Sequence, residues 1–143
     1  MSQRELINKG VANGRWGEAV AVEFLRRHGF EILETNSRPF KKDQRLEIDI
    51  VARDKKEETI VFVEVKQHSN LSPYQRRLRS VDLKKKKNLR CACNAWRRCN
   101  NLCSSPYRFD VVEIYGEPGY RPIIDHISNV RLFVPGERFV RWG

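Results

Sequence analysis

The chain has no apolar run long enough to cross a membrane, and the residues after Met1 lack the apolar stretch of a secretory signal. These absences predict a cytoplasmic protein without a membrane partner. No internal repeat or low-complexity segment is apparent. With 143 residues, the chain is expected to form one domain, 1–143, that is large enough for a single core.

Acidic residues are almost missing from residues 76–98, where Asp82 stands alone against ten of the chain's 28 lysines and arginines. Nearly all of the formal net charge of +10 therefore lies in this segment. Such a concentration is typical of a surface that binds polyanions, whereas a solvated helix face usually mixes charges of both signs. We therefore expect a nucleic-acid partner. The candidate contacts share one polar arc of a predicted helix: Lys86, Lys87, Arg90, Arg97 and Arg98.

Zinc-binding patterns are lacking as well. The four cysteines fit neither a paired CxxC pattern nor a mixed Cys/His pattern: Cys91, Cys93, Cys99 and Cys103. On a helix, the last three share a stripe with Leu89, Ala92 and Trp96. Free cysteine behaves there as a small apolar residue, so packing is predicted and metal or redox use is the alternative.

Hydrophobic periodicity predicts an α/β domain with the element order α-β-β-β-α-β-β. The first helix is expected from about Asn13 to His28, and the second from Ser80 or Val81 to about Cys103. Strands are expected at 30–35, 45–52, 59–67, 108–115 and 123–127. This order gives a mixed β-sheet flanked by helices. Residues 131–143 form an apolar tail that would cover the domain or a partner subunit.

The hairpin predicted at 45–67 carries charge that hydrophobic patterning does not explain. Glu47 and Asp49 share one face of its first strand, and Glu64 and Lys66 share one face of its second. If the strands pair with these faces together, carboxylates crowd a patch that ought to be core, where they repel unless a positive charge joins them. A divalent cation with oxygen ligands would meet that need. A solvated sheet face with cross-strand ion pairs is the alternative.

Glu18 interrupts the apolar face of the first helix, on which Ala21, Val22 and Leu25 follow at i+3, i+4 and i+7. That face otherwise suits packing on a sheet. The alternative is a carboxylate near the start of the helix, which the helix macrodipole favours.

Five blocks of the sequence, in this order, are similar to those of a known family. They are Gly14-x-x-Gly17-Glu18-x-x-Ala21, Asn36-x-Arg38, Glu47-Ile48-Asp49, Val61-Phe62-Val63-Glu64-Val65-Lys66 and Arg108-Phe109-Asp110-Val111-Val112. Over about residues 10–130 the chain resembles the small bacterial YraN-like family, whose members look like archaeal Holliday-junction resolvases. Asp49 followed by Glu64-Val65-Lys66 resembles the signature of the PD-(D/E)xK nuclease superfamily. Two positions depart from the family pattern: Leu46 replaces the usual glycine, and Gln67-His68 replace a small residue and arginine.

The resemblance implies a restriction-endonuclease-like core and a metal-dependent endonuclease that hydrolyses phosphodiester bonds of DNA. It implies Mg²⁺ or Mn²⁺ at Asp49 and Glu64, with Glu18 completing the site. Lys66 would orient or deprotonate the attacking water. Weaker assisting roles are left to Glu47 and Gln67.

Two further residues, Arg38 and His126, fall at positions that the family pattern also contains. Arg38 matches the family's Asn-x-Arg block and is a candidate phosphate contact, and His126 is expected to pack or hydrogen-bond rather than catalyse. A resolvase-like activity implies a preference for branched DNA and a homodimer, because symmetric cutting of two strands needs two active sites. The alternatives are a non-catalytic nucleic-acid-binding protein that retains the fold, and an assembly or adaptor protein.

Overall fold

The computed structural model describes residues 3–39, 41–43, 46–68, 79–80, 83–131 and 141–142; among these, it describes the side chains of residues 15–39, 41–43, 46–68 and 87–131. The elements follow the chain as α1 (Gln3–Arg27), β1 (Phe30–Ser37), β2 (Ile48–Asp54), β3 (Thr59–His68), β4 (Arg79–Ser80), α2 (Leu83–Cys99), β5 (Tyr107–Tyr115), β6 (Ile123–Ile127) and β7 (Arg141–Trp142). No helix in these ranges is long and apolar enough to cross a membrane.

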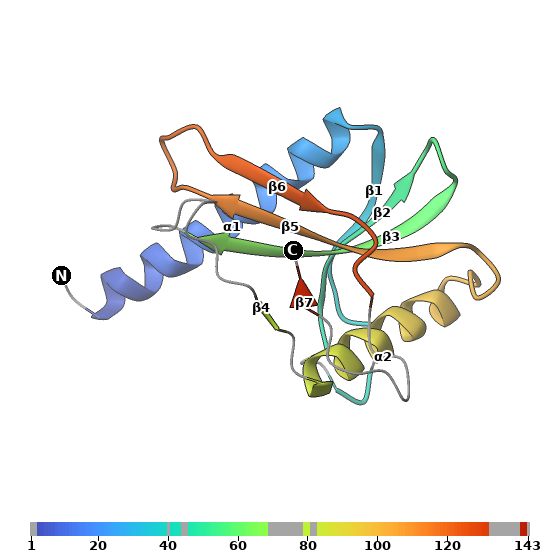
Figure 1. Cartoon of the computed structure of the whole chain (residues 1–143). Helices are drawn as coiled ribbons and strands as arrows, with labels where there is room; N and C mark the ends of the chain where they lie inside the picture. The colour runs from blue at the N-terminus through green and yellow to red at the C-terminus, as the bar shows by residue number, and fades with distance from the viewer. Residues whose placement is uncertain are drawn as a thin grey trace.

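The centre of the fold is a five-stranded mixed sheet in the order β1-β2-β3-β5-β6 (Figure 1). β3 and β5 are parallel, and the other neighbours in this sheet are antiparallel. The parallel pair is joined by a crossover that contains α2, as parallel strands require. β4 and β7 form a separate two-stranded pair. The structure thus confirms an α/β fold with a mixed sheet and two helices.

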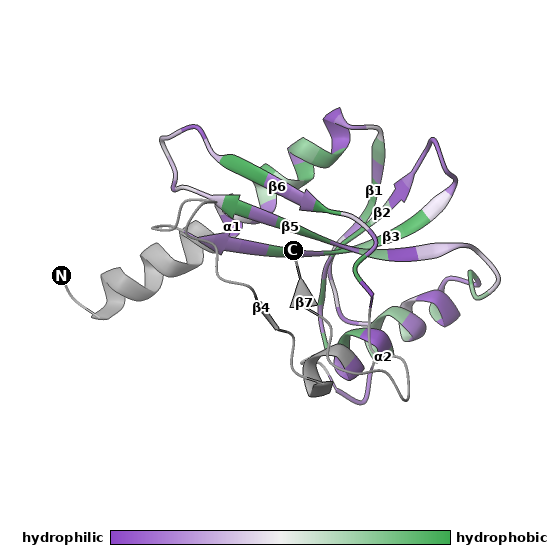
Figure 2. Cartoon of the chain, viewed as in Figure 1, coloured by the Kyte–Doolittle hydropathy of each residue, from purple (hydrophilic) through white to green (hydrophobic). Residues whose placement is uncertain are grey.

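Each face of the sheet packs against one helix. On one face, Ala21 and Leu25 of α1 contact a cluster of strand residues: Ile50, Val61, Val63, Val112 and Ile114. On the other face, Ala92, Cys93 and Trp96 of α2 contact Phe62, Phe109 and Val111. The two sets alternate along β3 and β5, as side chains of a strand covered on both faces must. In Figure 2, hydrophobic and hydrophilic residues form bands along the coloured part of α2, and Ala92, Cys93 and Trp96 lie on its side toward the sheet.

The bounds of both helices differ from those predicted. α1 begins at Gln3 rather than near Asn13; residues 3–12 contain no proline to stop a helix. α2 begins at Leu83, after the strand residue Ser80, and ends at Cys99 rather than near Cys103. The end is set by Asn101, which has a left-handed φ of 56°. The amides of Asn101 and Leu102 bond back to the carbonyl oxygens of Arg98 and Arg97, which is a Schellman motif.

This helix end corrects the prediction for the cysteines. Cys93 is buried in the α2 cluster as expected, and burial raises the pKa of its thiol. Cys99 is exposed, and Cys103 is exposed and lies beyond the helix, so neither packs in the core. Cys99 is the last residue of α2, and the predicted apolar stripe does not continue to Cys103 because the helix has ended.

The first strand of the hairpin was also misplaced: it runs over Ile48–Asp54 rather than 45–52. The amide of Leu46 bonds to the carbonyl oxygen of Asp43 at 3.2 Å, so the chain is still turning there. At the other end, Arg53 and Asp54 pair with Ile60 and Thr59 and lengthen the strand. Within the predicted tail, residues 132–140 and 143 lie outside the described ranges, and Arg141–Trp142 form β7.

Candidate functional site

Asp49 stands where β2 separates from β3. The ladder between the two strands ends at the pair Ile50 and Val63. Ile50 belongs to the α1-side cluster, but Ile48 belongs to the α2-side cluster, so the strand departs from regular alternation between them. At this point the Asp49 carboxylate accepts a hydrogen bond from the backbone N–H of Val65 at 2.8 Å. A side chain thus satisfies a β3 amide beyond the end of the ladder.

Three carboxylates converge at this point. Glu18 comes from α1, Glu47 directly precedes β2, and Asp49 lies within β2. One oxygen atom of each lies within 4.8 Å of the others, and all three residues are half-buried. We call Glu18, Glu47 and Asp49 the carboxylate group. It forms because α1 packs along the face of the sheet to which the Asp49 carboxylate turns.

The electrostatics of the carboxylate group are unfavourable without a proton or a cation. Burial raises the pKa of Asp49 to about 6, and the negative charges of Glu64, Glu18 and Glu47 act in the same direction. The hydrogen bond from Val65 opposes this shift only in part. A shared proton, a neighbouring side-chain cation or a bound divalent cation would each relieve this repulsion.

The donor set fits a hard divalent cation such as Mg²⁺, which prefers oxygen ligands. Gln67 supports the fit, because it lies against Gly17, the residue before Glu18, so tightly that a Cβ at Gly17 would overlap its side chain. Its Oε1 atom is buried and accepts no hydrogen bond from any described residue. An acceptor of this kind suits a water molecule on a hydrated ion.

The predicted residues Glu64 and Lys66 lie on β3, next to the point where the Asp49 carboxylate meets the Val65 amide. Glu64 is close enough to raise the pKa of Asp49, but it is not one of the three carboxylates within 4.8 Å of each other. Glu64 and Lys66 are half-buried and alternate with Val63 and Val65, which pack toward α1. They therefore project from the other side of the strand than Val63 and Val65, just beyond the end of the β2–β3 ladder where Asp49 lies.

Glu47 and Arg38 form an ion pair at 3.2 Å, in which just over half of the Arg38 side chain is exposed. Glu47, which the sequence analysis left as an assisting residue, is a full member of the carboxylate group. Arg38, predicted as a phosphate contact, is positioned beside the carboxylate group and partly neutralises it.

The predicted nucleic-acid contacts of α2 lie across the sheet from Glu18. Lys87 and Arg98 are exposed and Arg90 is half-buried, whereas the side chain of Lys86 lies outside the described set. Arg97 is engaged within the protein: its guanidinium stacks on Tyr107 at 3.8 Å and donates to Asn94 and to the carbonyl oxygen of Cys103. Lys87 and Arg98 are therefore the clearest candidates for an external anion.

A network around Asp110 gives the Arg108-Phe109-Asp110 block a structural role that the sequence did not assign. The fully buried carboxylate of Asp110 accepts hydrogen bonds from Arg108 at 3.1 Å, His126 at 2.8 Å and the amide of Asn129 at 2.8 Å. His126 also contacts the rings of Phe24 and Phe30 edge-on. The prediction that His126 packs and hydrogen-bonds is confirmed.

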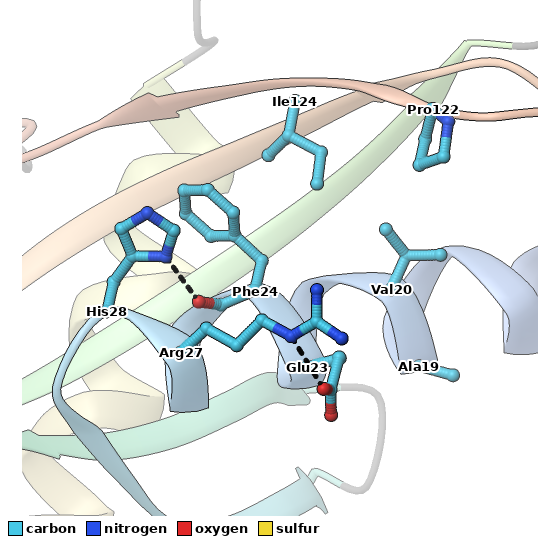
Figure 3. Close-up of a pocket in the computed structure, with 8 residues that line it drawn as sticks. All are labelled: Ala19, Val20, Glu23, Phe24, Arg27, His28, Pro122 and Ile124. Atoms are coloured by element: carbon cyan, nitrogen blue, oxygen red, sulfur yellow. Dashed lines mark hydrogen bonds and ion pairs between the residues drawn. The ribbon is translucent and has the colours of Figure 1, made fainter.

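A hollow of about 430 Å³ lies between α1 and the β6 side of the sheet (Figure 3). Its walls are mostly apolar and include Val20, Phe24, Pro122 and Ile124. Glu23 binds Arg27 at 2.9 Å, and the imidazole of His28 donates to the carbonyl oxygen of Phe24 at 2.7 Å. None of the three carboxylates lines the hollow, which lies on the flank of α1 away from Glu18.

Comparison with known proteins places this arrangement in a family. The "Uncharacterised protein family UPF0102" matches residues 17–114, a range that includes all three members of the carboxylate group. A UPF0102 protein of Clostridioides difficile is 42% identical over 116 residues, covering 81% of this chain and 93% of the relative. One from Acetivibrio thermocellus is 41% identical over 110 residues, 77% of this chain and 80% of the relative. The chain therefore belongs to the UPF0102 family.

Proposed function

We propose that this protein is a cytoplasmic, metal-dependent endonuclease that hydrolyses phosphodiester bonds of DNA. The observation that carries the proposal is the convergence of Glu18, Glu47 and Asp49 at the point where β2 leaves β3. Glu64-Val65-Lys66 follow on the neighbouring strand, and the Val65 amide is bonded to Asp49. This combination supports membership of the PD-(D/E)xK superfamily with a restriction-endonuclease-like core, as the resemblance to YraN-like proteins implies.

The carboxylate group, with Glu64 beside it, would hold Mg²⁺ or Mn²⁺. When bound, the ion would supply Lewis-acid neutralisation of a phosphoryl oxygen and of the leaving group. The chain's own residues prepare the site. The Val65 amide fixes the orientation of Asp49, and Gln67 Oε1 is available to accept a hydrogen bond from a water molecule. Arg38 offsets the charge of Glu47.

Lys66 is proposed to orient the attacking water and to offset negative charge that develops during hydrolysis. Lys66→Ala should therefore lower kcat by about 10²-fold or more, in the range found when one preorganised donor is removed. Its affinity for Mn²⁺, measured by titration calorimetry, should stay close to that of the native protein because the ammonium is not a ligand. Loss of Mn²⁺ binding in this variant would make Lys66 a structural residue.

The substrate experiment uses purified protein, Mg²⁺ or Mn²⁺, and a panel of linear, nicked, flapped and four-way-junction DNAs. We expect cleavage that stops on chelation, with a preference for branched DNA. We also expect dimer formation on the four-way junction, seen by light scattering. Cleavage that persists in EDTA would refute the metal-dependent mechanism. A monomer that does not distinguish branched from linear DNA would refute the resolvase-like specificity.

The α2 cations are proposed to bind a second segment of DNA, because they lie on the opposite side of the sheet from the carboxylate group. A branched substrate can present segments to both sides. Each phosphate contact contributes roughly −0.9 to the slope of log affinity against log salt on duplex DNA. Lys87→Gln with Arg98→Gln should therefore flatten the slope by about 2 and weaken all sequences alike. An unchanged slope would place the DNA elsewhere.

One observation favours a second candidate function, a non-catalytic nucleic-acid-binding protein that retains the fold. Arg38 already offsets the charge of Glu47, so that carboxylate has a cation beside it without a bound metal ion. Salt-dependent DNA binding without cleavage in the panel above, in the presence of either metal, would identify this function.

A further inference from the structure

A cleft of about 330 Å³ runs between α1 and the end of β1, on the flank of α1 opposite the hollow of Figure 3. The residues that matter here are Arg15, Glu18, Glu23 and Arg26 on the helix, and Thr35 and Asn36 on the strand. Glu18 is also a member of the carboxylate group. The cleft therefore opens onto the candidate metal site, and it lies on the face away from the α2 cations.

The helical wall places one cation on each side of Glu18: Arg15 before it and Arg26 after it. Arg15, Glu18 and Arg26 stand at i, i+3 and i+11, which lie on one stripe of a helix. At a rise of about 1.5 Å per residue, Arg15 and Arg26 are roughly 16 Å apart along α1, with Glu18 nearer Arg15. One strand of B-form DNA carries a phosphate about every 3.4 Å of helix axis, so this separation corresponds to roughly five nucleotides.

Both arginines are available to a ligand. They are exposed, and neither has an ion pair or hydrogen bond with the side chains that the structure describes. The second acidic residue between them, Glu23, is paired with Arg27 at 2.9 Å (Figure 3). Glu18 therefore has a free guanidinium on each side along the helix, a pattern that attracts a chain of phosphates rather than an isolated carboxylate.

The strand wall connects the cleft to Asp49. Thr35 pairs with Ile50 and Ser37 pairs with Ile48, so Asn36 lies opposite Asp49 in the ladder. Asn36 has a left-handed φ of 52°, a conformation that asparagine adopts more readily than most residues. Thr35 and Asn36 add neutral hydrogen-bonding groups to the wall beside the carboxylate group, where a sugar or phosphate oxygen would pass.

We propose that this cleft binds the backbone of the DNA strand that is cut, with Arg15 and Arg26 holding two phosphates on either side of the linkage presented to Glu18 and Asp49. This inference rests on the proposed function and deepens it. It separates the cut strand, held by α1, from the second segment held by α2. It also predicts the register: the linkage presented for hydrolysis lies closer to the phosphate on Arg15 than to the phosphate on Arg26.

The test measures binding of a labelled synthetic DNA strand, alone and as a duplex, by fluorescence anisotropy without divalent metal. Arg15→Gln and Arg26→Gln should each flatten the salt slope by about 0.9. Arg121→Gln is the matched control, because Arg121 is exposed in the β5–β6 loop beside Pro122, on the other flank of α1. Its slope should equal that of the native protein.

A methylphosphonate scan then locates the two phosphates, because each substitution removes one backbone charge. The native protein should lose affinity at two positions separated by roughly five nucleotides. Arg15→Gln should abolish the sensitivity at one position, and Arg26→Gln at the other. Unchanged slopes and scans in both variants, with cleavage that still needs Asp49, would overturn the cleft proposal and leave the nuclease intact. Failure of the native protein to bind any of these DNAs would overturn the cleft proposal, whereas the absence of metal-dependent cleavage in the substrate panel would overturn the proposed function.

Discussion

Asp49→Asn is expected to stabilise the protein at neutral pH while it abolishes metal-dependent cleavage. In the folded protein, burial and the neighbouring carboxylates raise the pKa of Asp49 from 3.8 to about 6. Between these two pKa values the folded state holds a proton that the unfolded state has already released, so ionisation of Asp49 opposes folding. Asparagine keeps an oxygen that can accept the Val65 amide but removes the charge.

The sign of the pH dependence follows from this shift. Between the unfolded pKa of 3.8 and the folded pKa of about 6, the native protein loses stability as the pH rises, and above that range the loss is complete. At neutral pH the variant should gain about 2 to 3 kcal/mol in free energy of unfolding, and roughly half as much near pH 5. Urea denaturation of both proteins across this range, in the presence of chelator, measures the difference. Equal stability of the native protein and the variant at every pH would show that burial and the neighbouring carboxylates do not raise the pKa of Asp49.

In the presence of divalent metal, the native protein should become more stable than the Asp49→Asn variant. Binding to the folded state alone stabilises the native protein in proportion to the logarithm of metal concentration, and Asp49→Asn should lose most of that gain. Its cleavage rate should fall by at least roughly 100-fold, since even outer residues of a metal site cost up to that factor when replaced. Full activity in this variant would remove Asp49 from the site.

The sequence was sufficient to predict the α/β class, the antiparallel hairpin and the crowding of carboxylates, because these follow from alternation along strands and from the order of elements. It ranked Glu47 below Glu64 because the resemblance to the PD-(D/E)xK signature points to Glu64, although alternation places Glu47 on the strand face of Asp49. The departure from regular alternation between Ile48 and Ile50 depends on how β2 leaves β3 and how α1 packs there, which no local pattern encodes. The exposure of Cys99 and Cys103 was also not predictable from local pattern. It depends on where α2 ends, and Asn101 sets that end without the glycine or proline that usually signals one.

Asp110→Ala is expected to be among the most destabilising single changes in this fold. The carboxylate is fully buried, and its bonds to Arg108, His126 and the Asn129 amide join β5, β6 and the segment that follows β6. Although burial by itself opposes ionisation, these three donors together lower the pKa of Asp110. Its ionised form therefore stabilises the folded state, and that contribution is lost as the pH falls through its folded pKa.

Removing one partner of a buried ion pair typically costs about 3 to 5 kcal/mol, because the other charge stays buried without compensation. Arg108 keeps Asp54 at 3.2 Å and Glu57 at 2.9 Å, so the cost should lie near the lower end of that range. Asp110→Asn preserves volume and one acceptor and should therefore cost less, about 2 kcal/mol. This cost remains because the amide nitrogen of asparagine cannot accept a hydrogen bond from Arg108. Glu117→Gln, a charge removal in the exposed β5–β6 loop, is the matched control and should stay within about 0.5 kcal/mol of the native protein.

Urea denaturation at neutral and acidic pH separates a charge effect from a packing effect. If the charge of Asp110 is what stabilises the network, the difference between native protein and Asp110→Asn should shrink as the pH falls, because the native carboxylate also becomes protonated. A difference that stays constant with pH would mean that shape and hydrogen bonding, rather than charge, hold β5 and β6 together. Because Asp110 lies outside the carboxylate group, metal affinity per folded molecule should be unchanged in the asparagine variant. That result would separate the residues that hold the fold from those proposed to cut DNA.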